Sequence, residues 1–423
     1  MMLKYSTKIF PRLVGYRLAR KGFIKTPPGP LILNFSVTNL CQSRCTTCNI
    51  WELYQKSPEQ LKNELTIDEI DKLFASMDDI FLLNICGGEP FLRKDLPEIC
   101  ESASKHVHPA VIHMPTNCLD VETTRKNARR ILEKIPSSTQ LTIKMSLDGI
   151  GDDHDTIRGV KGNFKKLLQV HEILIGLREE YPNLYVDAGS TISTANLTKL
   201  KEIRDYVNKN MRVDNYLNEI ADTRAELFNT DLTEDVPGFA RPVTRDLKIT
   251  PDAQEYDEAT QEIVKYVKED MRNKRKLSKI TQALRIVYYK RTARSMLEAR
   301  RMVPCYAGRS NCHLNPWGDI WICNVQAFRH SMGNVRTFHY DFKKLWASEE
   351  ADKQRKWVDE EHCHCPLVGQ GFLDTILNPV ETGKVFYNYI KYGFTDAAKR
   401  EANGNGFKGV KGVTHENTQV VRA

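Results

Sequence analysis

Six short apolar segments alternate with amphipathic segments between residues 31 and 220, and this alternation restricts the fold more than any other feature of the chain. The predicted strands are residues 31–37, 80–85, 110–114, 141–147, 184–192 and 213–220. Predicted helices lie between them, at 121–134, 164–180 and 197–209, after the capping-box pair Thr66 and Glu69, and after Asp95. Strands separated by helices predict a parallel sheet covered by helices. The pattern fits both a doubly wound sheet and an incomplete barrel, and in either architecture ligands bind at the C-terminal ends of the strands.

The composition narrows the class of protein. The chain has 423 residues, of which 41% are apolar and 27% charged, so it can build a core and is not disordered as a whole. It contains no run of eighteen apolar residues that would predict a membrane-spanning helix. The basic N-terminal segment lacks the continuous apolar core of a secretion signal. Together with an odd number of cysteines, eleven, this predicts a cytoplasmic protein with reduced thiols.

Three cysteines follow the first predicted strand within eight residues, as Cys41, Cys45 and Cys48. Three thiolates on one loop can hold three irons of a cubane [4Fe-4S] cluster and leave the fourth iron open for a ligand. A zinc site is the alternative, but it would use four ligands and usually pairs of CxxC. The CxxxCxxC spacing at the end of a strand therefore favours an iron–sulfur cluster.

These residues resemble the radical S-adenosylmethionine (radical SAM) superfamily, and the resemblance extends over residues 31–220. It implies a partial (β/α)6 TIM barrel with S-adenosylmethionine (SAM) bound beside the cluster. After the second strand come Gly87, Gly88, Glu89 and Pro90, which match the family motif that receives the methionyl amino group of SAM. An isolated Gly-Gly-Glu-Pro would otherwise read as an ordinary turn.

Further SAM contacts are implied at the ends of the third and fourth strands and just beyond them. They are Thr116 and Asn117, then Ser146 and Asp148, and finally Arg158. The resemblance makes Ser146 a partner of the ribose or carboxylate of SAM. The planar guanidinium of Arg158 could hydrogen-bond to the SAM carboxylate. The alternative is that Arg158 forms a surface salt bridge.

Two cysteines lie next to these motifs. Cys118 stands where the family often has Gly in Thr-Asn-Gly, and Cys86 directly precedes the Gly-Gly-Glu-Pro turn. By analogy with epimerising members of the family, either thiol could donate a hydrogen atom to a substrate radical. Small buried cysteines are more often packing residues, so this alternative stays open.

A second group of cysteines, between residues 305 and 365, resembles the SPASM or Twitch extension that follows many radical SAM barrels. The resemblance implies one auxiliary [4Fe-4S] cluster held by Cys305, Cys323, Cys363 and Cys365. Cys312 is a possible further ligand, a substrate contact or a plain strand residue. Zinc, held by these cysteines or with His362 or His364 replacing one of them, is the alternative metal.

Two segments carry most of the positive charge. Residues 271–301 contain eleven Lys and Arg with Glu298 as the only acid, and residues 1–26 contain seven Lys and Arg with no acid. Apolar residues recur at helical spacing in both segments, at Ile9, Phe10, Leu13, Val14 and Leu18 and at Leu277, Ile280, Leu284, Val287 and Tyr288. Such helices suit an anionic membrane surface, and the alternative is that they dock on the barrel. No recognised nucleic-acid-binding module accompanies the charge.

The sequence thus divides into five predicted parts. They are a basic N-terminal segment with a Pro-rich linker (1–30), a partial barrel (31–220), a basic helical linker (221–301), a smaller α+β auxiliary-cluster domain (302–370), and a C-terminal helix with a flexible tail (371–423).

The function implied by the resemblance is reductive cleavage of SAM to a 5′-deoxyadenosyl radical, which abstracts hydrogen from an unactivated carbon. The outcome would be an oxidation, an epimerisation or C–C or C–S bond formation, with an electron supplied by ferredoxin or flavodoxin. The basic N-terminal helix favours a membrane-associated lipid or glycan as substrate and a peripheral location at the membrane. The alternatives are an enzyme that modifies ribosomal peptides, nucleosides or sugars and, more remotely, a non-enzymatic zinc or iron–sulfur protein.

Overall fold

The computed structural model describes residues 2–221, 249–274, 276–360 and 368–395. Its strands are β1 (Ile32–Thr38), β2 (Leu82–Gly87), β3 (Val111–Thr116), β4 (Gln140–Ser146), β5 (Leu184–Ile192), β6 (Asn215–Ile220), β7 (Asn311–Leu314), β8 (Asp319–Trp321) and β9 (Ser331–Asn334). Its α-helices are α1 (Met2–Arg20), α2 (Leu53–Lys56), α3 (Ile67–Ser76), α4 (Leu96–His106), α5 (Val121–Lys134), α6 (Asp152–Arg158), α7 (Asn163–Glu180), α8 (Leu200–Asn210), α9 (Ala253–Asp270), α10 (Lys276–Leu297), α11 (Phe342–Trp346), α12 (Glu349–Asp359), α13 (Val368–Leu377) and α14 (Pro379–Phe394).

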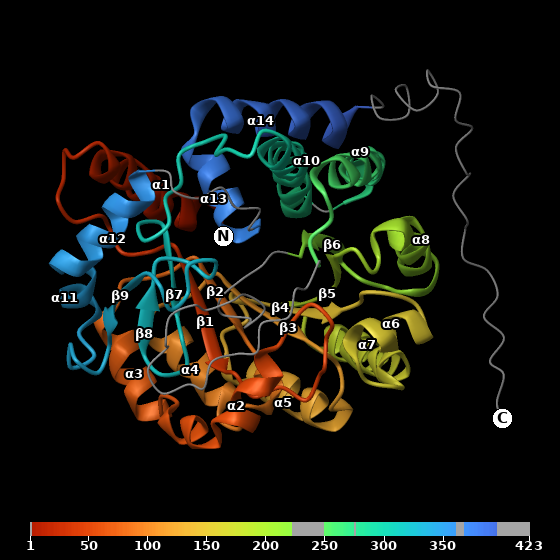
Figure 1. Ribbon diagram of the computed structural model, residues 1–423, viewed down its shortest axis with the longest axis horizontal. Coiled ribbons are helices and arrows are strands. Elements are labelled where there is room, and N and C mark those ends of the chain that lie inside the picture. The colour runs from red at the N-terminus through yellow and green to blue at the C-terminus, as the bar shows by residue number, and fades with distance from the viewer. Residues whose placement is uncertain (1, 222–248, 275, 361–367, 396–423) are drawn as a thin grey trace.

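The strands form one nine-stranded sheet in the order β6-β5-β4-β3-β2-β1-β7-β8-β9. Neighbours from β1 to β6 are parallel, and the sheet curves with helices on its outer side (Figure 1). The partial (β/α)6 barrel expected from the sequence is therefore the fold, and the sheet does not close into a full barrel.

The segment that carries the second cysteine group continues this sheet. Strand β7 pairs in parallel with β1, from Ile32 opposite Asn311 to Phe35 opposite Leu314. Strands β8 and β9 then add in antiparallel order. The C-terminal region is thus joined to the barrel through main-chain hydrogen bonds along β1, which the sequence pattern did not indicate.

The main core lies between the sheet and its outer helices. Successive side chains of a strand point to opposite faces, so one set of residues from each strand meets the helices. Phe35 of β1 packs edge-to-face on Phe74 of α3 with ring centroids 6.3 Å apart. We call the other side, which carries Asn84, His113 and Lys144, the inner face.

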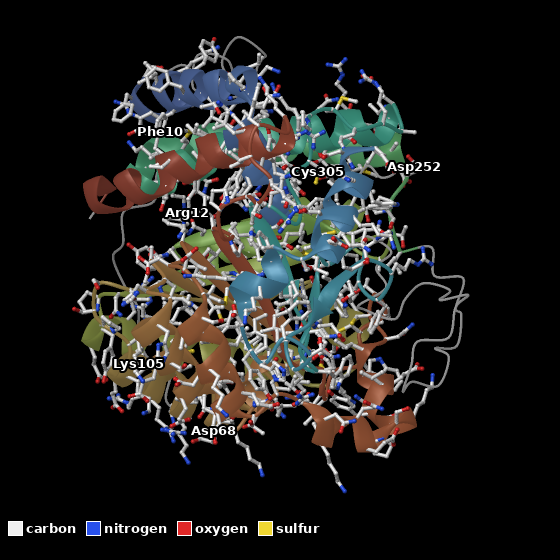
Figure 2. The ribbon with its side chains drawn as sticks, turned by 90° about the vertical axis from the view of Figure 1, so that its left-hand side faces the viewer. Phe10, Arg12, Asp68, Lys105, Asp252 and Cys305 are labelled. Carbon is white, nitrogen blue, oxygen red and sulfur yellow. The ribbon has the colours of Figure 1, made fainter. Side chains whose placement is uncertain are left out.

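The predicted apolar face of the N-terminal helix is divided by the fold. Ile9 and Leu13 of α1 pack beside the buried Tyr16, whereas Phe10 and Val14 are 68% and 40% exposed. Arg12 donates to the carbonyl of Asp79, so the helix is tied to the barrel (Figure 2). Only one edge of the predicted apolar face is therefore covered.

The basic helix α10 packs against the body of the molecule rather than standing free. Ala283, Ile286, Tyr288 and Tyr289 are buried against its neighbours. Arg291 donates to the Gly371 carbonyl at 2.6 Å. In Figure 1, α10 lies with α9 and α14 at the top of the molecule, beyond β6. Of the two interpretations of this basic segment, docking on the barrel therefore describes α10 better than binding to a membrane surface does.

Candidate functional site

A cavity of about 190 Å³ opens at the C-terminal ends of the strands. It is the place where the sequence motifs come together. Of the predicted residues, the cavity is lined by Cys41, Cys45, Cys48, Gly87, Gly88, Glu89, Thr116, Asn117, Ser146 and Arg158. Pro90 and Asp148 are buried behind this lining. Segments more than a hundred residues apart in the chain thus meet where the fold places ligands.

The cysteine loop is held by backbone contacts to the segment after β4. The N–H groups of Arg44 and Thr46 donate to the carbonyl oxygens of Arg158 and Ile157 at 3.0 and 2.9 Å. Gly159 allows this approach because it has φ +67°, and a Cβ there would lie 2.1 Å from the Arg44 carbonyl oxygen. The loop and the Arg158 segment are therefore positioned together.

The donor set fits a metal cluster. Burial raises the pKa of the Cys41 thiol to about 12 and that of Cys48 above its ordinary value, and the nearby Cys45 acts in the same direction. A cationic centre would offset this cost and bind the groups as thiolates. Within the described ranges, no group of three or more His, Cys, Asp or Glu side chains is placed to hold a single metal ion. A cubane has a different requirement, since each thiolate binds a different iron.

The Gly-Gly-Glu-Pro turn is fixed to the end of β3 by Glu89. Its Oε2 accepts the backbone N–H of Asn117 at 2.7 Å, and its Oε1 accepts that of Phe91 at 3.2 Å. Burial raises the pKa of Glu89 to about 7, and these two donors act against the increase. Glu89 therefore links two cavity walls, and its contact with the amino group of SAM stays a prediction.

Arg158 offers a positively charged fork beside the thiols. Its Nη1 donates to Asp148 Oδ2 at 3.0 Å, while its buried Nε has no hydrogen-bond partner among the described residues. Asp148 is itself anchored, because its Oδ1 accepts the backbone N–H of Thr191 at 2.7 Å. An orphaned guanidinium N–H at a cavity wall fits the carboxylate that the sequence resemblance places there.

Two charged residues of the site escaped the sequence reasoning. Lys144 of β4 and Glu219 of β6 form an ion pair at 2.9 Å, and Glu219 lines the cavity. The sequence did contain a signal for these two residues, because each is a charged residue inside an otherwise apolar or neutral strand. It became interpretable only with the register that places both residues on the inner face.

The two predicted hydrogen-atom donors have different surroundings. Cys118 is 0% exposed within the core, and its φ is +62°. Cys86 is partly exposed, and its Sγ lies 3.6 Å from Ser36 Oγ. Ser36 Oγ in turn lies 2.9 Å from Nε2 of His313 on β7. Neither thiol is part of the cavity lining.

The auxiliary cysteines lie around the start of β7. Cys305 and Cys323 are both buried, and the Gly308 N–H donates to the Ile322 carbonyl at 3.1 Å, which brings the two segments together. Cys312 is fully buried on β7 within the main core. Cys363 and Cys365, with His362 and His364, lie outside the described residues, so the ligand set stays a prediction.

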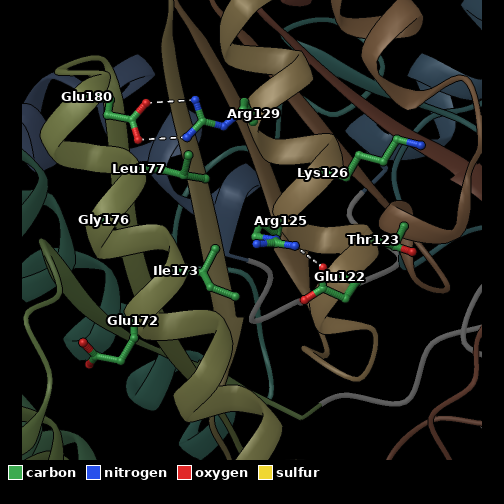
Figure 3. A pocket seen from close by; sticks show the side chains of 10 residues that line it. All are labelled: Glu122, Thr123, Arg125, Lys126, Arg129, Glu172, Ile173, Gly176, Leu177 and Glu180. Carbon is green, nitrogen blue, oxygen red and sulfur yellow. Dashed lines mark hydrogen bonds and ion pairs between the residues drawn. The ribbon is translucent and has the colours of Figure 1, made fainter.

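A larger hollow of about 620 Å³ lies elsewhere, on the outer surface between α5 and α7 (Figure 3). Four of its charged groups already form two pairs with one another. Arg129 makes two 2.8 Å hydrogen bonds to Glu180, and Arg125 pairs with Glu122. The hollow is lined by the outer helices α5 and α7 and by none of the predicted site residues, so the smaller cavity is the better candidate site.

Two family models match this chain. The Radical SAM superfamily model matches residues 35–218, and an iron–sulfur cluster-binding domain, SPASM, matches residues 305–366. The first model covers the strands that surround the cavity, and the second covers Cys305, Cys323 and the segment beyond them.

Individual proteins also match part of this chain. Fe-coproporphyrin III synthase of Methanosarcina barkeri is 31% identical over 157 residues, which are 35% of this chain and 36% of that protein. Mycofactocin maturase MftC of Mycolicibacterium smegmatis is 28% identical over 170 residues, 40% of this chain and 39% of MftC. The matches therefore span less than two fifths of the length of either relative.

A solved structure shows the same fold. Streptococcus suis SuiB, crystallised with its precursor peptide SuiA, superposes with a TM-score of 0.51 at 13% identity, covering 78% of this chain and 67% of SuiB. No helix in the described part of the chain combines the length and apolar character needed to cross a bilayer. The two domain models imply a [4Fe-4S] cluster with SAM in the barrel and auxiliary iron–sulfur binding beyond it. The chain belongs to the radical SAM superfamily and carries a SPASM iron–sulfur cluster-binding domain.

Proposed function

We propose that this protein is an enzyme that uses SAM to abstract a hydrogen atom from a polar substrate held against the inner face of the barrel. One observation carries the proposal. A single cavity gathers Cys41, Cys45 and Cys48 with the Gly-Gly-Glu turn and with Arg158, whose Nε has no hydrogen-bond partner among the described residues. When bound there, a reduced [4Fe-4S] cluster supplies the electron that cleaves SAM into methionine and a 5′-deoxyadenosyl radical.

The residues of the chain would divide the work by position. The three thiols would hold the cluster, and Arg158 would orient SAM through its carboxylate. Glu89 keeps the turn and the end of β3 together, so both walls hold their spacing. The electron would come from an external donor such as ferredoxin or flavodoxin, and the SPASM cluster would hold the substrate or accept an electron from it.

The inner face supports a polar substrate. Lys144 pairs with Glu219, and His113 hydrogen-bonds to Asn84 at 2.7 Å. Burial lowers the pKa of His113 to about 3, so its imidazole is neutral near pH 7. An acyl chain packed here would desolvate these groups without replacing their water, which is unfavourable. A peptide could hydrogen-bond to them, and SuiB, which shares the fold, was crystallised with a precursor peptide.

Peripheral contact with an anionic membrane is a second proposal, independent of the substrate. Phe10, Val14 and Leu18 of α1 lie at helical spacing and are all exposed, and Lys21 and Lys25 are exposed just beyond them. An apolar edge beside cations suits an anionic lipid surface. Co-sedimentation with phosphatidylserine vesicles, lost in Phe10→Ser/Val14→Ser but not in Val380→Ser, would support this contact. Absence of co-sedimentation would rule it out.

Anaerobic reconstitution with iron and sulfide, followed by dithionite and SAM, tests the enzyme proposal. The protein should release 5′-deoxyadenosine, slowly without substrate, and Cys45→Ala should release none. Cys100→Ala is the matched control, because Cys100 is buried on α4 in the core away from the cavity. No product from the starting protein, or equal product from Cys45→Ala, would contradict the proposal. About eight irons per chain would indicate two cubane clusters and about four a single one.

Substrate class can be tested with the same reaction. Peptides encoded beside the gene should accelerate 5′-deoxyadenosine release, whereas a polar lipid extract should not. Acceleration by the lipid extract alone would overturn the peptide proposal and favour the membrane-associated substrate.

Cys86 is the better-placed of the two proposed hydrogen-atom donors. It is partly exposed, whereas Cys118 is enclosed. Its S–H would give a hydrogen atom to the substrate radical, and the resulting thiyl radical would take an electron and a proton from the external donor system. Cys86→Ala should then yield 5′-deoxyadenosine without a deuterium-labelled product in D2O, while Cys118→Ala should retain labelling. Full labelling with Cys86→Ala would exclude this role.

A further inference from the structure

A second cavity, of about 190 Å³, lies at the β6 edge of the barrel and contains a buried cation, Arg285. It is enclosed by residues of α8, β6, α9 and α10. Strand β6 separates it from the candidate active site, since Tyr216 and Asn218 line this cavity while Glu219 and Ile220 line the other. None of the sequence motifs and neither proposed activity accounts for it.

Among the residues that the structure describes, Arg285 has no counter-ion in contact. Arg285 is 3% exposed, and it forms no ion pair with any carboxylate of the described residues. Its nearest neighbours are neutral. Nη1 donates to Gln282 Oε1 at 3.1 Å, and the guanidinium lies 5.9 Å from the Tyr289 ring centroid. A buried guanidinium that is not paired with a carboxylate is costly unless a ligand supplies the negative charge.

Two acidic side chains in this region do not fill this role. Asp270 is already paired with Lys274 at 2.9 Å. Asp187 on β5 accepts a hydrogen bond from Asn215 at 3.0 Å. Burial raises the pKa of Asp187 to about 7, so its carboxyl is partly neutral at that pH even though Arg285 favours its charge.

Two amide side chains of the cavity, Gln282 and Asn208, are oriented with their NH2 groups free to donate. Gln282 uses its carbonyl oxygen to accept from Arg285, and Asn208 uses its own to accept from the Tyr266 hydroxyl at 2.7 Å. Their NH2 groups make no hydrogen bond to any described residue and remain available. A guanidinium with two amide NH2 groups matches the acceptor oxygens of a carboxylate or a phosphate.

We propose that the cavity between β6 and α10 is an oxyanion-binding site in which Arg285, Gln282 and Asn208 bind a carboxylate or phosphate group. The site is independent of the radical chemistry, because it needs neither the cluster nor SAM. Its ligand is a small free anion or the anionic group of a larger molecule that enters from the open edge of the barrel.

Two substitutions test the site in different ways. Arg285→Gln removes the charge. Gln282→Glu instead places a carboxylate on the side chain that already lies 3.1 Å from the guanidinium, so it should satisfy Arg285 internally and keep the fold. Arg294→Gln is the matched control on the same helix, because Arg294 is 65% exposed and pairs with Glu298.

The measurement is the thermal unfolding midpoint of the full chain, titrated separately with sodium phosphate and sodium acetate against sodium chloride at constant ionic strength. A ligand that binds only the folded state raises the midpoint. Phosphate, acetate or both should stabilise the starting protein and Arg294→Gln, and the better of the two identifies the preferred group. Binding should weaken about tenfold or more in Arg285→Gln and Gln282→Glu.

Two results would overturn the proposal. One is an unfolding midpoint of the starting protein that neither anion raises above its value in chloride. The other is equal stabilisation of Gln282→Glu and the starting protein, which would place the bound anion elsewhere on the surface. If Arg285→Gln does not fold, the comparison of Gln282→Glu with Arg294→Gln still decides the question.

Discussion

The backbone N–H of Glu89 donates to the carbonyl oxygen of Leu40 at 2.8 Å, one residue before the first cysteine of the cluster loop. The preceding Gly88 makes this approach possible, because a Cβ at Gly88 would lie 2.3 Å from the same carbonyl oxygen. The turn after β2 and the loop after β1 are therefore held in direct main-chain contact, and the cavity takes its shape from that contact.

Gly88→Ala should separate the turn from the cluster loop, since the clash is with backbone and cannot be relieved by a side-chain rotation. We expect reduced iron incorporation and weaker SAM binding, measured by iron analysis and by equilibrium dialysis after anaerobic reconstitution. Gly176→Ala on the exposed side of α7 is the control (Figure 3), because nothing lies within 4 Å of its added Cβ. That change should leave iron content unaltered and stabilise the protein by up to about 1 kcal/mol. Normal SAM binding by Gly88→Ala would show that the close contact is not needed.

Glu64 links the cluster loop to the turn region, although no motif contains it. It accepts hydrogen bonds from the Tyr54 hydroxyl at 2.5 Å, the Asn39 N–H at 3.2 Å and Arg93 at 3.2 Å. Glu64→Ala would leave these donors buried, so we expect the free energy of unfolding to fall by about 3 kcal/mol. Urea unfolding measures this loss. Glu59→Ala, at an exposed position of the same loop, should change it by less than about 0.5 kcal/mol.

Cys118 occupies a left-handed backbone conformation, which glycine adopts without strain. With φ at +62°, any residue with a Cβ is strained, by roughly 1–2 kcal/mol relative to glycine. Cys118→Gly and Cys118→Ala both remove the buried sulfur, but only the glycine removes the strain. Cys118→Gly should therefore be the more stable of the two by about 1 kcal/mol in urea unfolding. The reverse order would mean that the conformation carries little strain.

Asp187 should give the protein a measurable pH dependence of stability. Burial raises its folded-state pKa from 3.8 to about 7, although Asn215, Arg285 and Lys144 oppose this. The folded protein then binds more protons than the unfolded chain between these values, so this contribution to stability is lost as the pH rises from about 4 to about 7.

Asp187→Asn removes the titration, so its stability relative to the starting protein should increase between about pH 5 and about pH 8. Urea unfolding at the two pH values gives the comparison. Asp205→Asn is a suitable control, because Asp205 lies on the exposed side of α8 and its pKa is lowered rather than raised. A difference between Asp187→Asn and the starting protein that is the same at both pH values would contradict the assignment.

The sequence was informative where the signal is local. The strand 184–192 and the helix 121–134 have the predicted bounds, because each combines a clear hydrophobic period with a strong end signal. The capping box of Thr66 and Glu69 forms as expected. The cysteine motif, the turn and Arg158 meet at one cavity because all three follow strands of a parallel sheet.

The features that the sequence did not predict depend on contacts between segments that are far apart in the chain. Nothing in residues 311–314 indicates pairing with β1, since four apolar and polar residues could join any sheet edge. Arg285 lies in a basic helix whose sequence is typical of a solvent-exposed helix. Only the packing of α9 against α10 buries Arg285. Burial of charge is a tertiary property, so charge counts along the chain could not reveal it.

The pairing of β7 with β1 has a consequence for recombinant production of the barrel. A fragment ending before Asn311 would expose the main-chain donors and acceptors along Ile32–Phe35 as a flat, apolar edge. Such edges template the association of further copies, so this fragment should aggregate. In the intact chain the edge is instead the four-residue β9, which packs against α12. The SPASM segment thus acts for the barrel as a protective cover against self-association, whatever metal it carries.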